Sequence, residues 1–318
     1  MQQETRMPTQ YVAIAVVVLT YNRLELLQAL LRQLVGLAWP GLEIIVVDNC
    51  STIPASTLEA TFPGVTFLRS PRNVGTGGRN IGIAAARADI VVCLDDDVSS
   101  LTSSALELLA GLFVDPRLGA VCFKVIEAGT GHVMNWVHHK PLEAFADREF
   151  ETYEITEGAV AFRRTAAVDA GLYPEHFFIS HEGPDLALRL IDRGFEVRYV
   201  PRIHVVHAYS PLARTSWRNY YYDTRNTFWL AARNLPVLPA LRMLVWQIGS
   251  MLLYSLRDGF FVWWLRGIRD GLAGLPQAFR ERQPVSKSTL GRLAAMDKDR
   301  AGIAYLLRTR LFRRGIKI

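Results

Sequence analysis

Three consecutive carboxylates, Asp95, Asp96 and Asp97, follow an apolar run that begins at Ile90. Such a run is typical of a strand buried on both faces, where an unpaired charge would be very costly. We therefore expect the triplet at the carboxyl end of a strand, facing solvent or a cation. Magnesium is commonly held by one or two carboxylates and substrate phosphates, so a metal-bound phosphate would compensate these charges. The alternative is a charged turn in which Asp97 or Ser99 caps the next helix.

Other polar motifs follow the remaining strands expected in the first hundred residues. Strands are predicted at 12–19, 42–47, 65–68 and 90–94, with helices at 23–37 and 78–87. This alternation indicates an α/β fold with a mostly parallel central sheet, whose strand ends share one edge. The residues expected there, besides the triplet, are Thr20, Tyr21, Asn22, Arg23, Asp48, Asn73, Gly77, Gly78 and Arg79. This set suits a nucleoside diphosphate with a divalent metal. The carboxylate of Asp48 could bind a base or ribose, the glycines allow the backbone to approach the ligand closely, and Arg79 is a cation near the start of a helix.

The order and spacing of these motifs resemble the family-2 glycosyltransferases of the GT-A fold, in particular rhamnosyltransferase-like enzymes of bacterial polysaccharide pathways. The family's D-x-D motif falls on Asp95 and Asp97, and its N-x-G-x-(A/G)-G-x-R-N segment falls on residues 73–80. The resemblance implies a UDP- or dTDP-linked sugar donor, with Mg²⁺ or Mn²⁺ as cofactor. Asp95, Asp96 and the strand-end residues named above would contact this donor. It also implies inversion at the anomeric carbon and a lipid-linked or growing saccharide as acceptor.

The resemblance also suggests a catalytic base and a third metal ligand. The family's acidic pair, Glu-Asp-x-Asp-Leu, aligns with residues 182–186, but Gly183 stands where relatives carry the usual base. Glu182 is the predicted base and Asp185 the alternative, although Asp185 could instead complement a helix dipole. His207 is the predicted third ligand. Strand alternation places His204 and His207 on opposite faces, so at most one reaches the site.

The charge of the chain is concentrated at its C-terminal end. The net charge is +6, yet residues 280–318 contain 11 Lys and Arg against 3 acids, a balance of +8 that leaves −2 for the rest. A basic tail beside a slightly acidic catalytic part argues against nucleic acid as a partner and favours an anionic membrane surface. Three scattered cysteines and the lack of an N-terminal signal pattern predict reduced thiols and a cytoplasmic location.

The C-terminal third predicts membrane association. We expect a GT-A catalytic domain at 1–216 and a helical, membrane-associating region at 217–318. Its signals are an aromatic belt at 217–229, an apolar run at 237–256 and an amphipathic helix at 256–279. These features predict a peripheral protein on the inner face of the cell membrane, with packing on the catalytic domain or a homo-oligomer as the alternative.

Two other functions share the same motifs. A sugar-phosphate nucleotidyltransferase would have a similar nucleotide-binding layout, but residues 20–23 follow the first strand where a glycine-rich phosphate loop would be expected. A non-catalytic nucleotide-sugar-binding scaffold is the other alternative, because Gly183 replaces the usual base.

Overall fold

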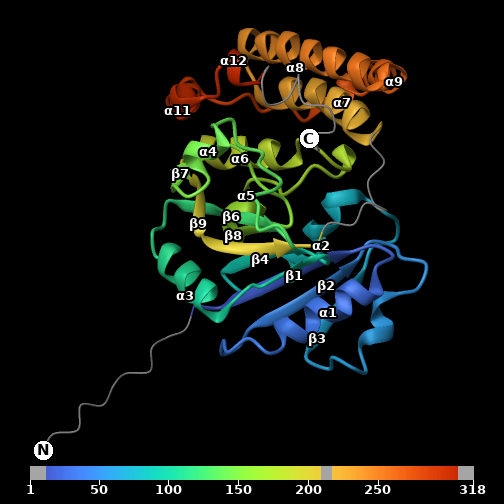
Figure 1. The fold of residues 1–318 in the computed structure, drawn as a ribbon, viewed down its shortest axis with the longest axis vertical. Coiled ribbons are helices and arrows are strands. Elements are labelled where there is room, and N and C mark those ends of the chain that lie inside the picture. Colours follow the sequence, from blue (N-terminus) through green and yellow to red (C-terminus); the bar gives the residue numbers. More distant parts are fainter. Residues whose placement is uncertain (1–11, 209–216, 307–318) are drawn as a thin grey trace, which may run out of the picture.

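The structure is a computed structural model that describes residues 12–208 and 217–306 (Figure 1). The strands are β1 (Ile14–Thr20), β2 (Glu43–Asp48), β3 (Val65–Arg69), β4 (Ile90–Asp95), β5 (Val98–Ser99), β6 (Leu118–Glu127), β7 (Phe150–Glu151), β8 (Ala159–Arg163) and β9 (Glu196–His207). The helices before residue 209 are α1 (Leu24–Leu34), α2 (Arg79–Ala85), α3 (Ser103–Leu112), α4 (Leu142–Phe145), α5 (Arg164–Asp169) and α6 (Glu182–Asp192). The later helices are α7 (Trp217–Asn234), α8 (Val237–Asp258), α9 (Phe261–Ala273), α10 (Leu275–Arg280), α11 (Lys287–Met296) and α12 (Ile303–Leu306). Short 3₁₀ turns are η1 (Ala55–Leu58), η2 (Gly75–Gly78), η3 (Glu175–Phe177) and η5 (Asp297–Asp299).

One sheet contains all of these strands, in the order β3-β2-β1-β4-β8-β6-β9-β5, with β7 also paired to β9. Strands β1 to β4 pair in parallel, β6 pairs in parallel with β9, and β8 runs antiparallel to both β4 and β6. The predicted mostly parallel α/β sheet is therefore confirmed. Its register places Thr20 beside Asp48 and Leu19 beside Asp95, so the predicted strand ends lie at one edge.

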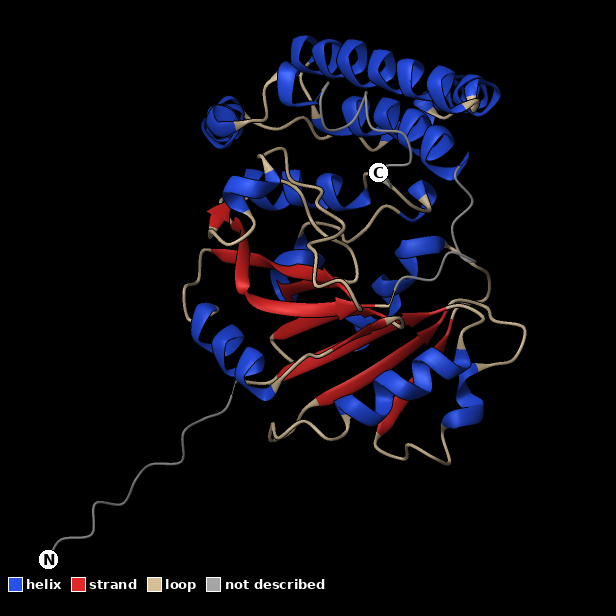
Figure 2. Ribbon diagram, viewed as in Figure 1, coloured by secondary structure: helices blue, strands red, loops and turns tan. Residues whose placement is uncertain are grey.

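Helices cover both faces of the sheet (Figure 2). Alternate side chains of β1 enter different cores: Val16 and Val18 pack with α1 and α3, whereas Ala15 and Val17 pack with α2, α5 and α6. Because β1 is buried on both faces, its sequence is a continuous apolar run. Helices α7 to α12 form a further layer beyond α6 (Figure 1).

Helix α7 is part of the folded core, which corrects the predicted interfacial belt at 217–229. Tyr220 and Trp229 are buried, and Trp229 joins Phe177 and Leu188 in a third apolar cluster. The Trp229 indole also donates a hydrogen bond of 2.9 Å to the carbonyl of Gly271 on α9. Aromatic residues that suit a membrane interface equally suit a helix packed between two protein layers.

The region after α7 also differs from the predicted single helix at 256–279. Gly259 adopts a left-handed conformation, with φ of 79°, and ends α8, so the chain turns before α9 begins. Helix α8 is the one described helix that is long and apolar enough to cross a membrane. The mean hydropathy of its most apolar stretch is 1.4, and 6% of that stretch is buried. Its outer face and part of α9 therefore remain uncovered in the described chain.

Part of the described basic tail packs back onto the rest of the protein. Arg292 pairs with Glu151 at 2.5 Å, and Arg282 donates to the backbone carbonyls of Ala232 and Leu235. These two guanidiniums are engaged within the protein, and contact of the basic tail with an anionic surface stays a prediction. The basic residues from 308 onward lie outside the described residues.

Candidate active site

The acidic triplet lies at the predicted edge, but two of its members are buried rather than open to solvent. Asp95 is the last residue of β4, while Asp96 and Asp97 form the turn before β5 and are 1% and 8% exposed. The alternative of a capping turn is wrong, because α3 is capped by Thr102, whose hydroxyl accepts from the Ala105 amide.

Arg23, directly before α1, compensates the two buried carboxylates. Its guanidinium lies 2.9 Å from Asp96 Oδ1 and 2.6 Å from Asp97 Oδ2. Asp96 also accepts a hydrogen bond of 2.7 Å from the Thr20 hydroxyl. Burial raises the pKa of Asp96 to about 7, although Arg23 and Thr20 oppose that rise. Thr20 and Arg23 therefore organise the acidic turn.

Asp95, Asp97 and His207 form a candidate metal site. One ligand atom from each lies within 4.8 Å of the others. Pairing of Val98 on β5 with His207 on β9 holds the imidazole there, and His204 is exposed on the other face as alternation predicts. Asp97 Oδ1 and both His207 ring nitrogens are buried without a hydrogen-bond partner. Such orphaned acceptors suit a divalent cation, so the residues present fit the implied metal.

Arg79 lies beneath this site instead of at its surface. It begins α2, is 1% exposed, and its guanidinium pairs with the Asp95 carboxylate, which is 25% exposed. Burial opposes its charge, but Asp95 outweighs this effect and the pKa of Arg79 is raised. Arg79 therefore fixes Asp95, and the predicted direct contact with the donor stays a prediction.

The glycine-rich segment before Arg79 is packed against the protein's own chain. A Cβ on Gly78 would lie 2.7 Å from Leu19 Cδ1, and one on Gly77 would lie 2.9 Å from Glu175 Cα. Asn49 ties the segment down: its amide donates 2.9 Å hydrogen bonds to Asn73 Oδ1 and to the Gly75 carbonyl. These contacts explain the glycines by packing, while donor contacts by Asn73, Gly77 and Gly78 stay predictions.

Asp48 organises the loop that follows β2. Its carboxylate accepts hydrogen bonds from the amides of Ser51 and Ala55, at 2.7 and 3.1 Å, and pairs with Arg69 at 2.5 Å. Burial alone would raise the pKa of Asp48, but these hydrogen bonds and Arg69 together lower it. Arg69 was not predicted from the sequence, although its position beside Asp48 follows from the parallel pairing of β2 and β3.

Tyr21 and Asn22 lie between β1 and α1 at the same edge. Tyr21 is 43% exposed, and Asn22 has a φ of 56° and accepts 2.7 Å from the Thr52 amide. An exposed ring and a strained turn beside the acidic cluster are compatible with the predicted donor contacts, which remain predictions.

Helix α7 holds the loop that leads to Glu182. Asn226, fully buried, donates hydrogen bonds of 3.0, 2.8 and 2.7 Å to the carbonyls of Phe177, Ile179 and Ser180. Sequence reasoning missed this residue. A buried amide within an otherwise aromatic helix was the signal available, since buried polar groups require partners.

Glu182, the predicted base, begins α6 and is 1% exposed, with Oε2 lacking a hydrogen-bond partner. Burial raises the pKa of Glu182, and hydrogen bonding and Arg79 only partly oppose this. The neighbour of Glu182 is Glu157, which lies in the loop before β8. Burial, and to a smaller extent repulsion from Glu182, raises the pKa of Glu157 well above its usual range. Two carboxylates, one from α6 and one from the loop before β8, therefore lie together at the first turn of α6.

Asp185 has a different environment from Glu182. It is fully buried, and its oxygens contact Arg189 at 2.5 Å, Arg233 at 2.9 Å and Asn234 at 2.6 Å. Burial would raise its pKa, but the two guanidiniums and their hydrogen bonds lower it. These contacts join α6 to α7, and a saturated carboxylate of low pKa is a poor proton acceptor. The role of Asp185 as the alternative base stays a prediction.

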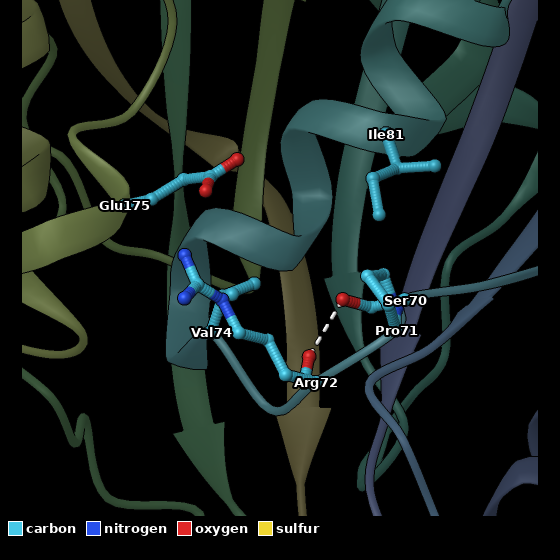
Figure 3. A pocket seen from close by; sticks show the side chains of 6 residues that line it. All are labelled: Ser70, Pro71, Arg72, Val74, Ile81 and Glu175. Carbon is cyan, nitrogen blue, oxygen red and sulfur yellow. Dashed lines mark hydrogen bonds between the residues drawn. The ribbon is translucent and has the colours of Figure 1, made fainter.

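A hollow of about 410 Å³ lies beside the start of the glycine-rich segment. It is lined by Ser70, Pro71, Arg72, Val74, Ile81 and Glu175. Figure 3 shows the side chains of Arg72 and Glu175 extending toward it from different loops. The triplet and His207 do not line it, so this hollow is separate from the candidate metal site.

A family model described as Glycosyl transferase family 2 matches residues 15–169. These residues include β1 to β8 and the acidic triplet. The chain is therefore similar to glycosyltransferase family 2 over 155 of its 318 residues. Its mostly parallel sheet is that of the GT-A fold.

Among individual proteins, the chain is similar to the O-antigen chain rhamnosyltransferase WbaN of Salmonella anatum. They are 25% identical over 191 residues, which covers 56% of this chain and 60% of that protein. It is 32% identical over 181 residues to the pre-mycofactocin glycosyltransferase of Mycobacterium tuberculosis, covering 52% of this chain and 37% of the relative. The chain thus spans less than two thirds of the length of these relatives.

Two solved structures share the fold across most of the chain. TarS 1–349 of S. aureus in complex with UDP-GlcNAc has a TM-score of 0.61 at 18% identity, covering 90% of this chain and 88% of that one. The mannosyltransferase PcManGT of Pyrobaculum calidifontis, in complex with GDP-Man and Mn²⁺, has a TM-score of 0.56 at 20% identity, with coverages of 91% and 80%.

Proposed function

We propose that the protein is an inverting, metal-dependent glycosyltransferase that moves a sugar from a nucleoside-diphosphate donor, UDP- or dTDP-linked, to a hydroxyl of a lipid-linked or growing saccharide. The observation that carries this proposal is the set Asp95, Asp97 and His207 at the ligand-binding edge of the sheet, in which Asp97 Oδ1 and the His207 ring nitrogens are buried without hydrogen-bond partners. Mg²⁺ or Mn²⁺ held there would stabilise the charge that develops on the leaving diphosphate.

The chain's own residues supply the rest of the reaction. Arg79 and Arg23 keep the carboxylates of the acidic turn in place, so little reorganisation is needed when the donor binds. The acceptor hydroxyl must lose its proton to a carboxylate on the opposite side of the anomeric carbon from the diphosphate. We propose that this carboxylate belongs to the pair Glu157 and Glu182.

A donor screen tests the proposal. UDP-, dTDP- and GDP-sugars are added with and without Mn²⁺, and the melting temperature is followed, since a ligand that binds the folded state raises it. A metal-dependent rise with one nucleotide sugar, followed by release of nucleoside diphosphate on addition of an acceptor, is expected. Release of pyrophosphate would identify a nucleotidyltransferase instead, and tight binding without turnover on any acceptor would support the scaffold alternative.

Changing Asp48 to Ala is expected to raise the donor KM more than the acceptor KM. The carboxylate orders residues 51–55 beside Thr20 and Asn22, so its loss loosens the donor side of the site. Steady-state kinetics with each substrate varied in turn measures the effect, with the exposed Asp169→Asn as control. An unchanged donor KM would remove Asp48 from the donor site.

We further propose that the C-terminal helices attach the protein to the inner face of an anionic membrane. The apolar patch consists of exposed side chains of α8 and α9: Val237, Leu238, Leu241, Val245, Trp246, Leu253, Leu256, Phe261, Val262, Leu265 and Leu272. A contiguous exposed apolar surface marks an interaction site, and two helices presenting it suit insertion into the interfacial layer.

The protein is expected to co-sediment with liposomes of anionic phospholipid and to resist a high-salt wash. Replacing Leu241 and Val245 by Glu should reduce sedimentation several-fold without lowering the melting temperature, because Val245 is 78% exposed. Replacement of Arg269, an exposed polar position on α9, by Glu is the matched control for charge. A wild-type protein that remains in the supernatant would contradict attachment, and a dimer in the same sample would assign the patch to a second copy.

A further inference from the structure

The carboxylate of Glu157 occupies the space beside Gly183. A Cβ built on Gly183 would overlap Glu157 Oε1 and would lie 2.9 Å from the Ile155 carbonyl oxygen. A side chain at position 183 and the present position of Glu157 therefore exclude one another. The loop before β8 thus delivers a carboxylate to the first turn of α6, at the residue where α6 itself has no side chain.

The next residue, Gly158, fixes this loop against the candidate metal site. It has a φ of 77°, and a Cβ there would overlap the Asp95 carboxyl group. Its carbonyl accepts a hydrogen bond of 3.3 Å from the Asp95 amide. Glu157 is therefore placed between the carboxylate that would bind the metal and the start of α6.

Glu157 and Glu182 differ in access to a substrate. Glu182 is 1% exposed and lies beneath the surface of the first turn of α6, whereas Glu157 is half-buried. A general base has to come within hydrogen-bond distance of the hydroxyl that it deprotonates, which a fully covered carboxylate cannot do without rearrangement.

We infer that Glu157 is the general base of the transfer and that Glu182 positions it. The acceptor hydroxyl gives its proton to Glu157 while its oxygen bonds to the anomeric carbon. The bond from that carbon to the diphosphate oxygen breaks, and its electron pair leaves with the nucleoside diphosphate. This assignment rests on the proposed glycosyl transfer and names the group within it that takes the proton.

The first test compares two isosteric variants, Glu157→Gln and Glu182→Gln, with the active donor and acceptor. Glu157→Gln is expected to lower kcat by about 10²–10⁴-fold while the donor KM stays within about threefold, as for loss of a general base. Glu182→Gln is expected to lower kcat by less. Folding is checked by the shift in melting temperature that UDP or dTDP produces with Mn²⁺, which both variants should keep.

The second test moves the carboxylate from one position to the other. Glu157→Ala should be as slow as Glu157→Gln, and the double variant Glu157→Ala/Gly183→Asp should recover at least tenfold, because removal of the Glu157 carboxylate frees the space beside residue 183. A wild-type kcat in Glu157→Gln, or a larger loss in Glu182→Gln with no recovery in the double variant, would overturn the assignment. No turnover by the wild-type protein with any donor would overturn the glycosyl transfer itself.

Discussion

Changing Asp97 to Asn is expected to slow sugar transfer by about 10²–10⁴-fold and to make nucleotide binding insensitive to Mn²⁺. Asp97 Oδ1 is the buried, unpartnered oxygen of the candidate metal site and lies 3.3 Å from His207 Nε2. A metal contributes several kcal/mol to stabilising a leaving diphosphate, which corresponds to a loss of about 10²–10⁴-fold in rate.

The measurement is a titration of UDP or dTDP into wild-type protein and Asp97→Asn, with Mn²⁺ or with EDTA, together with initial rates of transfer. Asp97→Asn should still fold, because Arg23 keeps its partner Asp96 at 2.9 Å. The exposed Asp169→Asn serves as the matched control. Wild-type activity that is unaffected by EDTA would contradict the metal site.

Changing Asp185 to Asn is expected to lower the free energy of unfolding by about 3–5 kcal/mol, the cost of breaking a buried ion pair. The variant leaves Arg189 buried without its carboxylate and leaves Arg233 only its ion pair with Glu281, at the contact between α6 and α7. Urea denaturation of the variant, compared with Asp169→Asn, measures the loss. Normal stability combined with a loss of kcat would instead favour Asp185 as the base.

The pH dependence of stability gives an independent readout of the same group. The folded state lowers the pKa of Asp185 below its usual value of about 3.9, so its stabilisation is complete above that pH. The stabilisation is lost as the pH falls through the lower, folded-state pKa, where the carboxylate becomes protonated. Asp185→Asn should therefore show less acid destabilisation than the wild-type protein as the pH falls below about 4.

The α/β fold and the sheet edge that carries the candidate site could both be predicted from the amino-acid sequence. Strand periodicity places the apolar run from Ile90 in the sheet, and a charged triplet cannot continue into that core. Parallel pairing then brings Thr20, Asp48 and Asp95 to one edge. Alternation along β9 also separates His204 from His207. These are local rules, and they need no knowledge of distant contacts.

The surroundings of the carboxylates, on which their proposed roles depend, are visible only in the three-dimensional structure. Glu182 and Asp185 are three residues apart in sequence, yet Glu182 Oε2 has no hydrogen-bond partner, whereas Asp185 is held by Arg233 and Asn234 from α7. Glu157 reaches Gly183 only because β8 reverses direction beside β4. Likewise, the aromatic residues of α7 are apolar enough for lipid or for a protein core, and packing against α6 and α9 selected the core. Residue type fixes what a side chain can do, but its charge state and access depend on neighbours that are distant in sequence.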